Sequence, residues 1–289
     1  MFKKKKDQTY QSYWSISWNI FKKNKVAMVS LFIVILLCLI ALFAPLIAPY
    51  DPNKQVLTDR LMKPCGQHWF GTDDLGRDIF SRIIYGCRVS LSVGIISQII
   101  ATVIGYTMGV CAGYYGGKVD SVISFLIQVF SSFPFLLFAM AIMFVLGPGL
   151  INLYLALGLL GWASTARLIR GDVMRLKKME YIDACKVSGG NSFRIIMKHL
   201  LPNCLSTLIV TVTLGIPNAI MSEASLSFLG LGVKAPMASW GSMISFSQPY
   251  IRSATYYSVI PGLAIIITVL AFNMLGDGLR DALDPKLRS

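Results

Sequence analysis

The sequence predicts an all-α polytopic membrane protein with six transmembrane helices. Three observations support this prediction. Hydrophobic residues make up 55% of the 289 residues and charged residues only 14%, whereas a soluble domain is typically about a quarter charged. The mean hydropathy is +0.62. The apolar residues also gather in runs nearly free of charge, each long enough to cross a bilayer, which takes about 20 residues of helix.

Six apolar runs define the expected spans. The first has no charge, is longer than the apolar region of a signal peptide and ends in a pair of prolines. The charge-free stretch 121–166 is long enough for two crossings, and the Gly-Pro-Gly sequence at 147–149 interrupts it as a turn. Residues 224–252 are rich in Gly, Pro, Ser and aromatic residues, which is typical of a re-entrant or interfacial segment. The expected spans are 26–48, 89–115, 121–146, 150–170, 200–222 and 256–276.

Small residues recur every four positions along the second expected span. On a helix these positions share one face, and such faces let another helix approach closely in lipid. Close packing is one interpretation, and a wall of a conduit is the other. The residues are Ser97, Ala101, Gly105, Gly109, Gly113 and Gly117.

The basic residues indicate how the chain is oriented. Residues 1–25 hold seven Lys against one Asp, and residues 167–198 hold eight Lys or Arg against three acids. Short cytoplasmic segments carry such an excess, so we expect the N-terminus (1–25), the loop 171–199 and the C-terminus (277–289) in the cytoplasm. Segment 49–88 then lies outside the cell membrane. Because the basic clusters flank apolar runs, the net charge of +13 favours a lipid bilayer as partner and no nucleic acid.

Residues for catalysis, metal binding or cofactor binding are sparse. The sequence has two His, no H-E-x-x-H pattern, no C-x-x-C pair and no phosphate-binding G-x-x-x-x-G-K-[ST] loop. We therefore expect no enzyme activity, no metal and no cofactor in this chain. Cys65 and Cys87 could meet outside the membrane, although their spacing does not require a disulfide.

A few polar residues lie in or beside the expected spans. Gln128, Asn152, Asn203 and Asn218 either form hydrogen bonds between helices or line a substrate path. Glu223 near the outer end of the fifth span is either a functional intramembrane acid or an interfacial carboxylate that caps a short helix at 224–231. Gln128, Asn218 and Glu223 are our candidates for a pathway or gate.

The cytoplasmic loop 171–199 has the order helix, glycine break, helix. Gly189 and Gly190 supply the break, because glycine readily adopts the left-handed conformation that ends a helix. Pro202 fits the first turn of the span that follows. A short charged helix that projects from the membrane is suited to binding a partner, and the alternative is a solvated loop without such a role.

This stretch resembles the EAA loop of ABC importer permeases, in which E-A-A-x-x-x-G is followed after nine residues by I-x-L-P. Here the pattern runs from Asp183 to Gly189 and from His199 to Pro202. Asp replaces Glu, Cys replaces the second Ala and His replaces Ile, while the spacing is intact. The H-x-L-P-N ending is similar to the peptide and nickel branch of these permeases.

Three further stretches resemble the same branch. They are FGTDDLGRD at 70–78, EASLSFLGLG at 223–232 followed by SWG at 239–241, and FNMLGDGLRD at 272–281. The matches extend in order over residues 26 to 285, so the sequence is identified as a C-type permease of the dipeptide, oligopeptide and nickel family. This resemblance implies the type I ABC importer fold, with the EAA loop between the fourth and fifth helices.

The resemblance also implies partners. A second, B-type permease, two cytoplasmic ATPases that bind ATP and Mg, and an extracytoplasmic solute-binding protein would complete the transporter. The EAA loop would couple to an ATPase, with an acid on its first helix pairing with a basic surface. The residues implied in coupling are Glu180, Asp183, Ala184, Cys185, Gly189, Arg194, His199 and Pro202.

Two substrate classes follow from the resemblance: dipeptides or oligopeptides, and nickel or a metal–chelator complex. No ladder of Cys, His and acids lines the expected spans, which favours peptides or a chelated metal over a bare ion. A membrane enzyme or a scaffold without transport would need a catalytic pair inside the spans, and the sequence offers none.

Overall fold

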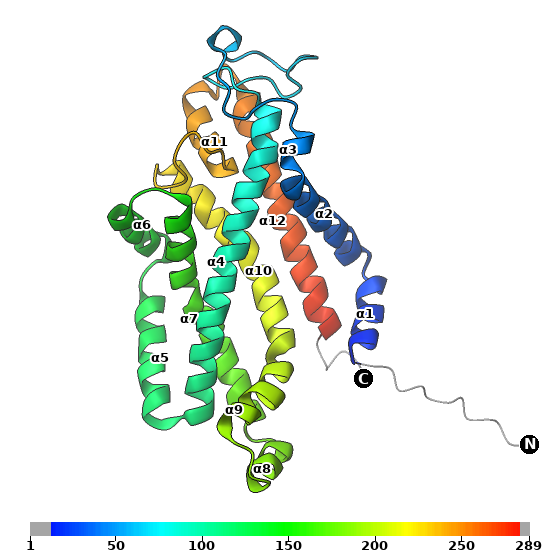
Figure 1. Cartoon of the computed structure of the whole chain (residues 1–289), viewed down its shortest axis with the longest axis vertical. Coiled ribbons are helices and arrows are strands. Elements are labelled where there is room, and N and C mark those ends of the chain that lie inside the picture. Colours follow the sequence, from blue (N-terminus) through cyan, green and yellow to red (C-terminus); the bar gives the residue numbers. More distant parts are fainter. Residues whose placement is uncertain (1–12, 284–289) are drawn as a thin grey trace, which may run out of the picture.

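Long α-helices make up the computed structural model of the protein, which describes residues 13–283 (Figure 1). Within these residues there is no strand, and the one β-bridge joins Thr72 to Asp78. The all-α prediction is confirmed. The helices are α1 (Tyr13–Lys23), α2 (Lys25–Leu42), α3 (Ala44–Ile47), α4 (Ile79–Tyr115), α5 (Gly117–Ser132), α6 (Phe135–Leu146), α7 (Leu150–Leu176), α8 (Glu180–Val187), α9 (Ser192–Ile195), α10 (Leu201–Phe228), α11 (Trp240–Ser247) and α12 (Thr255–Leu283), with 3-10 turns at Leu57–Asp59 and Gln248–Tyr250 and a π-helical turn at Ile196–Leu200.

The most extensive packing in the bundle joins α4 to α7. A methyl group added at Gly105 would lie 2.6 Å from Thr165 Cβ, and one at Gly109 would lie 2.7 Å from the Ala166 carbonyl oxygen. Gly113 approaches the Arg170 carbonyl in the same way, at 2.9 Å. The small-residue face of α4 therefore serves helix packing rather than the wall of a conduit.

Within residues 13–283, four or five candidate crossing helices meet the criteria of length and composition, so the expected six stays a prediction. Four helices are long and apolar enough to cross a membrane: α2, α4, the continuous helix Ser192–Phe228 and α12. The pair α5 and α6 passes the same test jointly, which brings the number to five. Helix α7 is 27 residues long but is not among them; its second half contains three Arg and one Asp.

The expected span 121–146 is broken in the structure. Helices α5 and α6 meet at 90°, because Pro134 has no N–H to continue α5 and pushes Phe133 into an extended conformation with φ −91° and ψ 138°. The Gly-Pro-Gly turn that we expected does exist, and it separates α6 from α7. The break at Pro134 was not among the expected helix boundaries.

Other helices begin or end beyond the expected bounds. Helix α4 begins at Ile79, ten residues before the expected start, because the Asp78 side chain accepts a hydrogen bond from Ser81 N (2.7 Å) and caps it. Helix α10 continues to Phe228 and α12 to Leu283. The run 26–48 is divided at Phe43 into α2 and α3. Residues 1–12 of the expected N-terminal segment 1–25 and residues 284–289 of the expected C-terminal segment 277–289 lie outside the described residues.

The segment between α3 and α4 forms a cap at the end of the bundle opposite α8 (Figure 1). Asp73 is fully buried in it and accepts from Arg77 Nε at 2.6 Å, while Arg82 Nε lies 3.4 Å from the same carboxylate. Arg82 also donates to the Pro52 carbonyl (2.9 Å). The Tyr257 hydroxyl of α12 donates to Asp74 (3.1 Å). These contacts fasten the cap to α4 and α12.

The cysteines of this region are not paired. Cys65 and Cys87 are both free, and Cys87 is buried in α4, where its thiol lies 3.5 Å from the Leu37 carbonyl oxygen. Charge pairs and hydrogen bonds, rather than a disulfide, connect the cap to the bundle.

We expect Gly105→Ala to destabilise the chain, because its new methyl group would collide with α7. Overpacking of this kind costs about 1–3 kcal/mol, which lowers the midpoint of thermal unfolding in detergent. Gly171→Ala on α7 is the matched control, since nothing lies within 4 Å of its added methyl group. Equal midpoints for the two variants would contradict the packing role.

We expect Asp73→Ala to destabilise the cap strongly, because two buried guanidinium groups would lose their shared carboxylate. Breaking a buried pair in this way typically costs about 3–5 kcal/mol. Asp51→Ala is the control, since this exposed carboxylate accepts a local hydrogen bond from Asn53 N (2.8 Å). Limited proteolysis of segment 49–78 measures the effect, and unchanged resistance of the Asp73 variant would refute it.

Candidate functional site

The loop between α7 and α10 projects from one end of the bundle (Figure 1). Its first short helix, α8, is held by one fully buried side chain, Ile182. Ile182 belongs to an apolar cluster with Val173 of α7, Ile195 of α9 and Leu200 of the π-helical turn. Because α4 and α7 contribute to the same cluster, the loop is a folded extension of the bundle.

The turn after α8 uses two glycines for different reasons. Gly189 has φ +80°, which side-chain-bearing residues rarely adopt, and its N–H donates to the Lys186 carbonyl (3.0 Å). Gly190 N–H donates to the Cys185 carbonyl (2.9 Å), and a methyl group at Gly190 would lie 2.6 Å from Cys185 Sγ. The expected helix, glycine break and second helix are therefore present as local structure.

Charged and apolar groups together form the exposed surface of this loop. Asp183 and Lys186 are exposed and paired with each other at 2.7 Å. Glu180 lies in the first turn of α8 beside Asp183, where the helix dipole stabilises a negatively charged carboxylate. Val187 is 90% exposed and Phe193 72% exposed. Sequence reasoning missed these two apolar residues, although their position on a short charged helix pair was a usable signal.

The remaining residues of the EAA pattern have mostly local roles. Ala184 is exposed, and Arg194 N donates to Asn191 Oδ1 (2.8 Å), which caps α9. The His199 ring lies 6.1 Å from that of Tyr181. Pro202 is in the first turn of α10 as expected, and it directly follows the π-helical turn, where Leu201 N–H donates to the Ile196 carbonyl.

Glu223 is inside α10 and does not cap a helix at 224–231, so that alternative was wrong. Its side chain is fully buried. One carboxylate oxygen accepts from the hydroxyls of Ser227 (2.6 Å) and Ser239 (2.7 Å), and the other lies 3.4 Å from the Ser90 hydroxyl. Glu223 thereby connects α10, α4 and the residue before α11.

Ser239 links Glu223 to α11, because Ser239 is the N-cap of that helix. Its hydroxyl accepts from Ser242 N (3.1 Å) while its own N–H donates to Ser242 Oγ (3.0 Å), which completes a capping box. Trp240 N donates to Ser90 Oγ (3.3 Å), and Trp240 Nε1 donates to the Ile83 carbonyl of α4 (3.1 Å). Helix α11 is therefore fixed at its start by one buried carboxylate.

The structure does not bring the other pathway candidates to Glu223. Five residues of helix turn by about 140°, so Asn218 faces away from Glu223. Asn218 is exposed and donates to its own helix at the Leu214 carbonyl (3.1 Å). Gln128 is exposed on α5. The inter-helix hydrogen bonds considered for Asn218 and Asn203 are also absent from the described residues, because Asn203 donates to the His199 carbonyl of the continuous helix.

Asn218 instead belongs to a polar stripe on α10. Ser222 and Ser225 follow it at helical spacing, and each hydroxyl donates to a carbonyl four residues earlier, at 2.8 and 2.9 Å. This stripe lies on a helix that is otherwise apolar enough to cross a membrane. The spacing of four and three residues was a signal that sequence reasoning did not use.

No group of three or more His, Cys, Asp and Glu side chains that could hold a metal occurs in residues 13–283. The geometry instead combines apolar membrane-length helices, a projecting helix pair with exposed apolar side chains, and a polar stripe. These features define a membrane-embedded transport component that works with partner proteins.

Comparisons with known proteins specify the family. Residues 102–289 match the family described as the binding-protein-dependent transport system inner membrane component, and residues 12–64 match the N-terminal TM domain of oligopeptide transport permease C. The chain belongs to this family of ABC importer permeases, as a C-type member of its dipeptide and oligopeptide branch. It is a multi-pass membrane protein and a transport component.

Curated relatives cover nearly the whole chain. The dipeptide transport system permease protein DppC of Bacillus subtilis is 46% identical over 96% of this chain and 87% of the relative. OppC, the oligopeptide permease of the same organism, is 42% identical over 96% and 91%. The glutathione permease GsiD of Pectobacterium atrosepticum is 41% identical over 98% and 95%.

A solved structure shares the fold. A chain of the MetNI methionine ABC transporter, in an inward-facing conformation, aligns with a TM-score of 0.58 and 19% identity. The alignment covers 71% of this chain and 98% of that chain. The helix arrangement is therefore that of an ABC importer permease.

We expect Glu223→Ala to loosen α11, because the hydroxyls of Ser227 and Ser239 would lose their acceptor. An unpartnered buried polar group costs about 1–3 kcal/mol, so amide hydrogen exchange across 239–247 should accelerate about tenfold or more. Glu223→Gln keeps one acceptor oxygen and should have a smaller effect. Ser225→Ala on the exposed side of α10 is the control, and identical exchange in all variants would exclude the connection.

Proposed function

We propose that this chain forms half of a transmembrane pathway for the uptake of dipeptides or oligopeptides, driven by ATP hydrolysis on separate subunits. The observation that supports this most is the projecting α8–α9 pair in a chain of this permease family. A second permease, two ATPases carrying ATP and Mg, and an extracytoplasmic solute-binding protein complete the transporter. This chain supplies no cofactor of its own.

The loop 171–199 is the coupling element. Val187 and Phe193 supply apolar area that a cleft on an ATPase can bury, and Asp183 can exchange its pairing with Lys186 for a basic group of that cleft. Coupling requires different contacts in the two nucleotide states. Ile182 transmits the displacement, because it packs against α7 and the base of the following helix.

The orientation follows from the charges. Both termini and the coupling loop lie in the cytoplasm, and the cap at 49–78 lies outside. An even number of crossings keeps both termini on that side, and we propose six. Helix α7 then acts as a crossing whose Arg-rich end reaches the cytoplasmic surface, and the bent pair α5–α6 is another.

The polar stripe of α10 faces the conduit. Asn218, Ser222 and Ser225 would be costly against lipid hydrocarbon but favourable against water or a passing solute. Gln128 of α5 is a second polar group in this role. Short amide and hydroxyl groups can exchange hydrogen bonds with a peptide backbone without selecting side chains, which suits a pathway for peptides of varied sequence.

The substrate class follows from the relatives. The curated relatives described above are named for dipeptides, oligopeptides and glutathione, all of which contain peptide bonds. The alternative, nickel or a metal–chelator complex, is less favoured, since these relatives are named for peptide substrates.

Uptake by vesicles that contain the whole complex tests this function. Labelled dipeptides and oligopeptides are compared with nickel and chelated nickel, with ATP supplied to the ATPases. We expect peptide accumulation, and Gly189→Pro should reduce it at least about tenfold, which lies within the range of typical coupling free energies. Proline cannot adopt the φ of +80° and lacks the N–H that donates to Lys186.

Lys178→Ala, an exposed change in the same loop outside α8, is the matched control and should transport normally. Metal accumulation in place of peptide would change the substrate class but leave the coupling mechanism standing. Undiminished transport in the Gly189→Pro variant would disprove the coupling role of the loop.

A further inference from the structure

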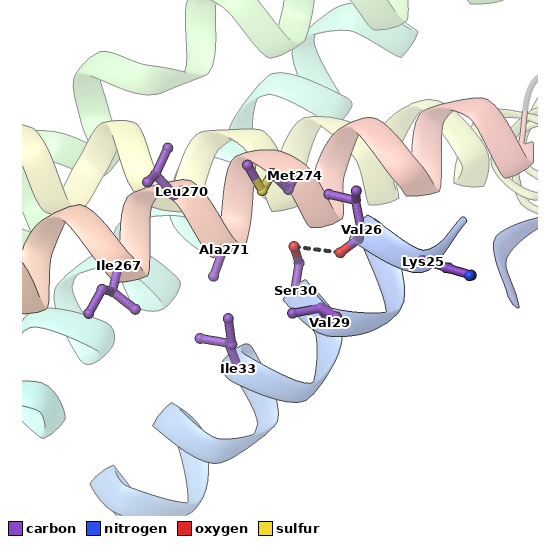
Figure 2. Close-up of a pocket in the computed structure, with 9 residues that line it drawn as sticks. All are labelled: Lys25, Val26, Val29, Ser30, Ile33, Ile267, Leu270, Ala271 and Met274. Carbon is purple, nitrogen blue, oxygen red and sulfur yellow. Dashed lines mark hydrogen bonds between the residues drawn. The ribbon is translucent and has the colours of Figure 1, made fainter. Parts of the chain in front are cut away.

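A groove with a volume of about 410 Å³ lies between α2 and α12 (Figure 2). Val29 and Ile33 line it from α2, and Ile267, Leu270 and Met274 line it from α12. Both helices are apolar enough to cross a membrane. The groove therefore opens along the length of two membrane helices.

The walls of the groove accept only hydrocarbon. Ser30 is its one hydroxyl-bearing residue, and the Ser30 hydroxyl donates to the Val26 carbonyl within α2 at 2.9 Å. Figure 2 shows this bond inside the helix rather than across the groove. Apart from Lys25, every other lining side chain is aliphatic or Met. A polar solute would lose its hydration here without gaining partners.

The groove results from the crossing of the two helices. They approach most closely where Gly278 faces Ala27, because a methyl group at Gly278 would overlap the Ala27 side chain. The side chain of Val29 remains 59% exposed and that of Leu270 49% exposed. The side chains of this chain thus leave the groove unfilled, and a flexible chain of methylenes can occupy it.

One end of the groove is basic. Lys25 lies at that end as the first residue of α2, and Lys22 and Lys23 are the last residues of α1. All three are exposed, and within residues 13–283 none forms an ion pair, although Asp277 and Asp281 lie in the last turns of α12. These lysines are available for an external anion.

Helix α1 adds an interfacial element beside the lysines. Trp18 is exposed and stacks on buried Phe21 at 5.6 Å, and Lys22 lies over the Trp18 ring at 5.2 Å. Tryptophan and lysine together are typical of the headgroup level of a membrane. Figure 1 places α1 toward the same end of the bundle as α8.

We propose that the groove between α2 and α12 binds one acyl chain of an anionic phospholipid, whose phosphate is held by Lys25 with Lys22 and Lys23 nearby. Anionic lipids attract such basic juxtamembrane groups in the cytoplasmic leaflet. The assignment of the lipid to the cytoplasmic leaflet rests on the orientation proposed above. The assignment to an anionic phospholipid rests on the apolar groove and its lysines. The lipid would stabilise the contact of α2 with the rest of the bundle.

Native mass spectrometry tests this site. The full-length chain, with the subunits that associate with it, is transferred to nanodiscs of equal phosphatidylglycerol and phosphatidylcholine and then released for lipid counting. We expect one retained phosphatidylglycerol. Lys25→Gln should weaken its retention about fivefold, given the contribution of one basic residue near an anionic surface. Val29→Trp, which fills the groove, should abolish retention of the lipid.

Leu36→Trp is the matched control, because Leu36 is an exposed α2 residue outside the groove, and this variant should keep its lipid. Equal retention of both lipids would overturn the anionic specificity. No retained lipid, with Val29→Trp releasing an associated permease subunit, would show that a protein helix covers the groove and would refute the proposal. Lipid retention is measured without transport, so its failure is distinguishable from failure of peptide uptake.

Discussion

The contact between α4 and α7 is the constraint on which the other features depend. Glycines of α4 let the two helices approach until backbone atoms nearly touch, and this contact extends from the middle of the bundle to the coupling loop. At its lower end, α4 contributes Val110 and Tyr114 to the cluster that holds Ile182. At its upper end, α4 contributes Ser90 and the Ile83 carbonyl to the attachment of α11. Both regions therefore depend on one helix pair.

Helix α10 connects these two regions directly. It continues from α9 without a break that ends the helix, and the continuous helix spans Ser192–Phe228. Ile195 near its start belongs to the cluster around α8, and Glu223 near its end holds the N-cap of α11. A movement of the projecting loop can thus reach the opposite end of the bundle through one continuous helix, whose polar stripe lies toward the Glu223 end.

Much of the fold was predictable because membrane helices follow from long apolar runs and from breaker residues. The glycine turn at 189–190 has the role expected from sequence. Of the two interpretations of the small-residue face, the structure supports close packing for Gly105, Gly109 and Gly113 but not for Gly117, which begins α5. The start of α4 was not predictable from charge, because Arg82 lies inside the helix with its charge compensated by Asp73, a partner nine residues away. A charge count ends the expected span at Arg88, which is exposed on the helix. It also excludes Arg82, although tertiary pairing with Asp73 offsets the cost of burying that charge.

The conformation of the loop 171–199 was predictable from sequence, but the contacts of Glu223 and the exposed apolar side chains of the loop were not. Local conformation located Gly189 and Pro202, since a glycine ends the first short helix and a proline fits the first turn of the next span. Asp183 was singled out by the resemblance to the EAA pattern. The role of Glu223 depends on Ser239, which is 16 residues away and meets it only after α11 folds back. Exposure of Val187 and Phe193 likewise depends on which face of the helix pair Ile182 buries. Such facts require the packed structure.

The π-helical turn at Ile196–Leu200 has a consequence for the angular phase of α10. A π turn takes one more residue than an α turn, and each residue of an α-helix rotates the following side chains by about 100°. The one extra residue thus sets which direction every later side chain of α10 points. Without it, Glu223 would turn away from Ser90 and Ser239, and the Asn218 stripe would turn with it. The π-helical turn therefore sets the rotation of the membrane helix relative to the projecting loop.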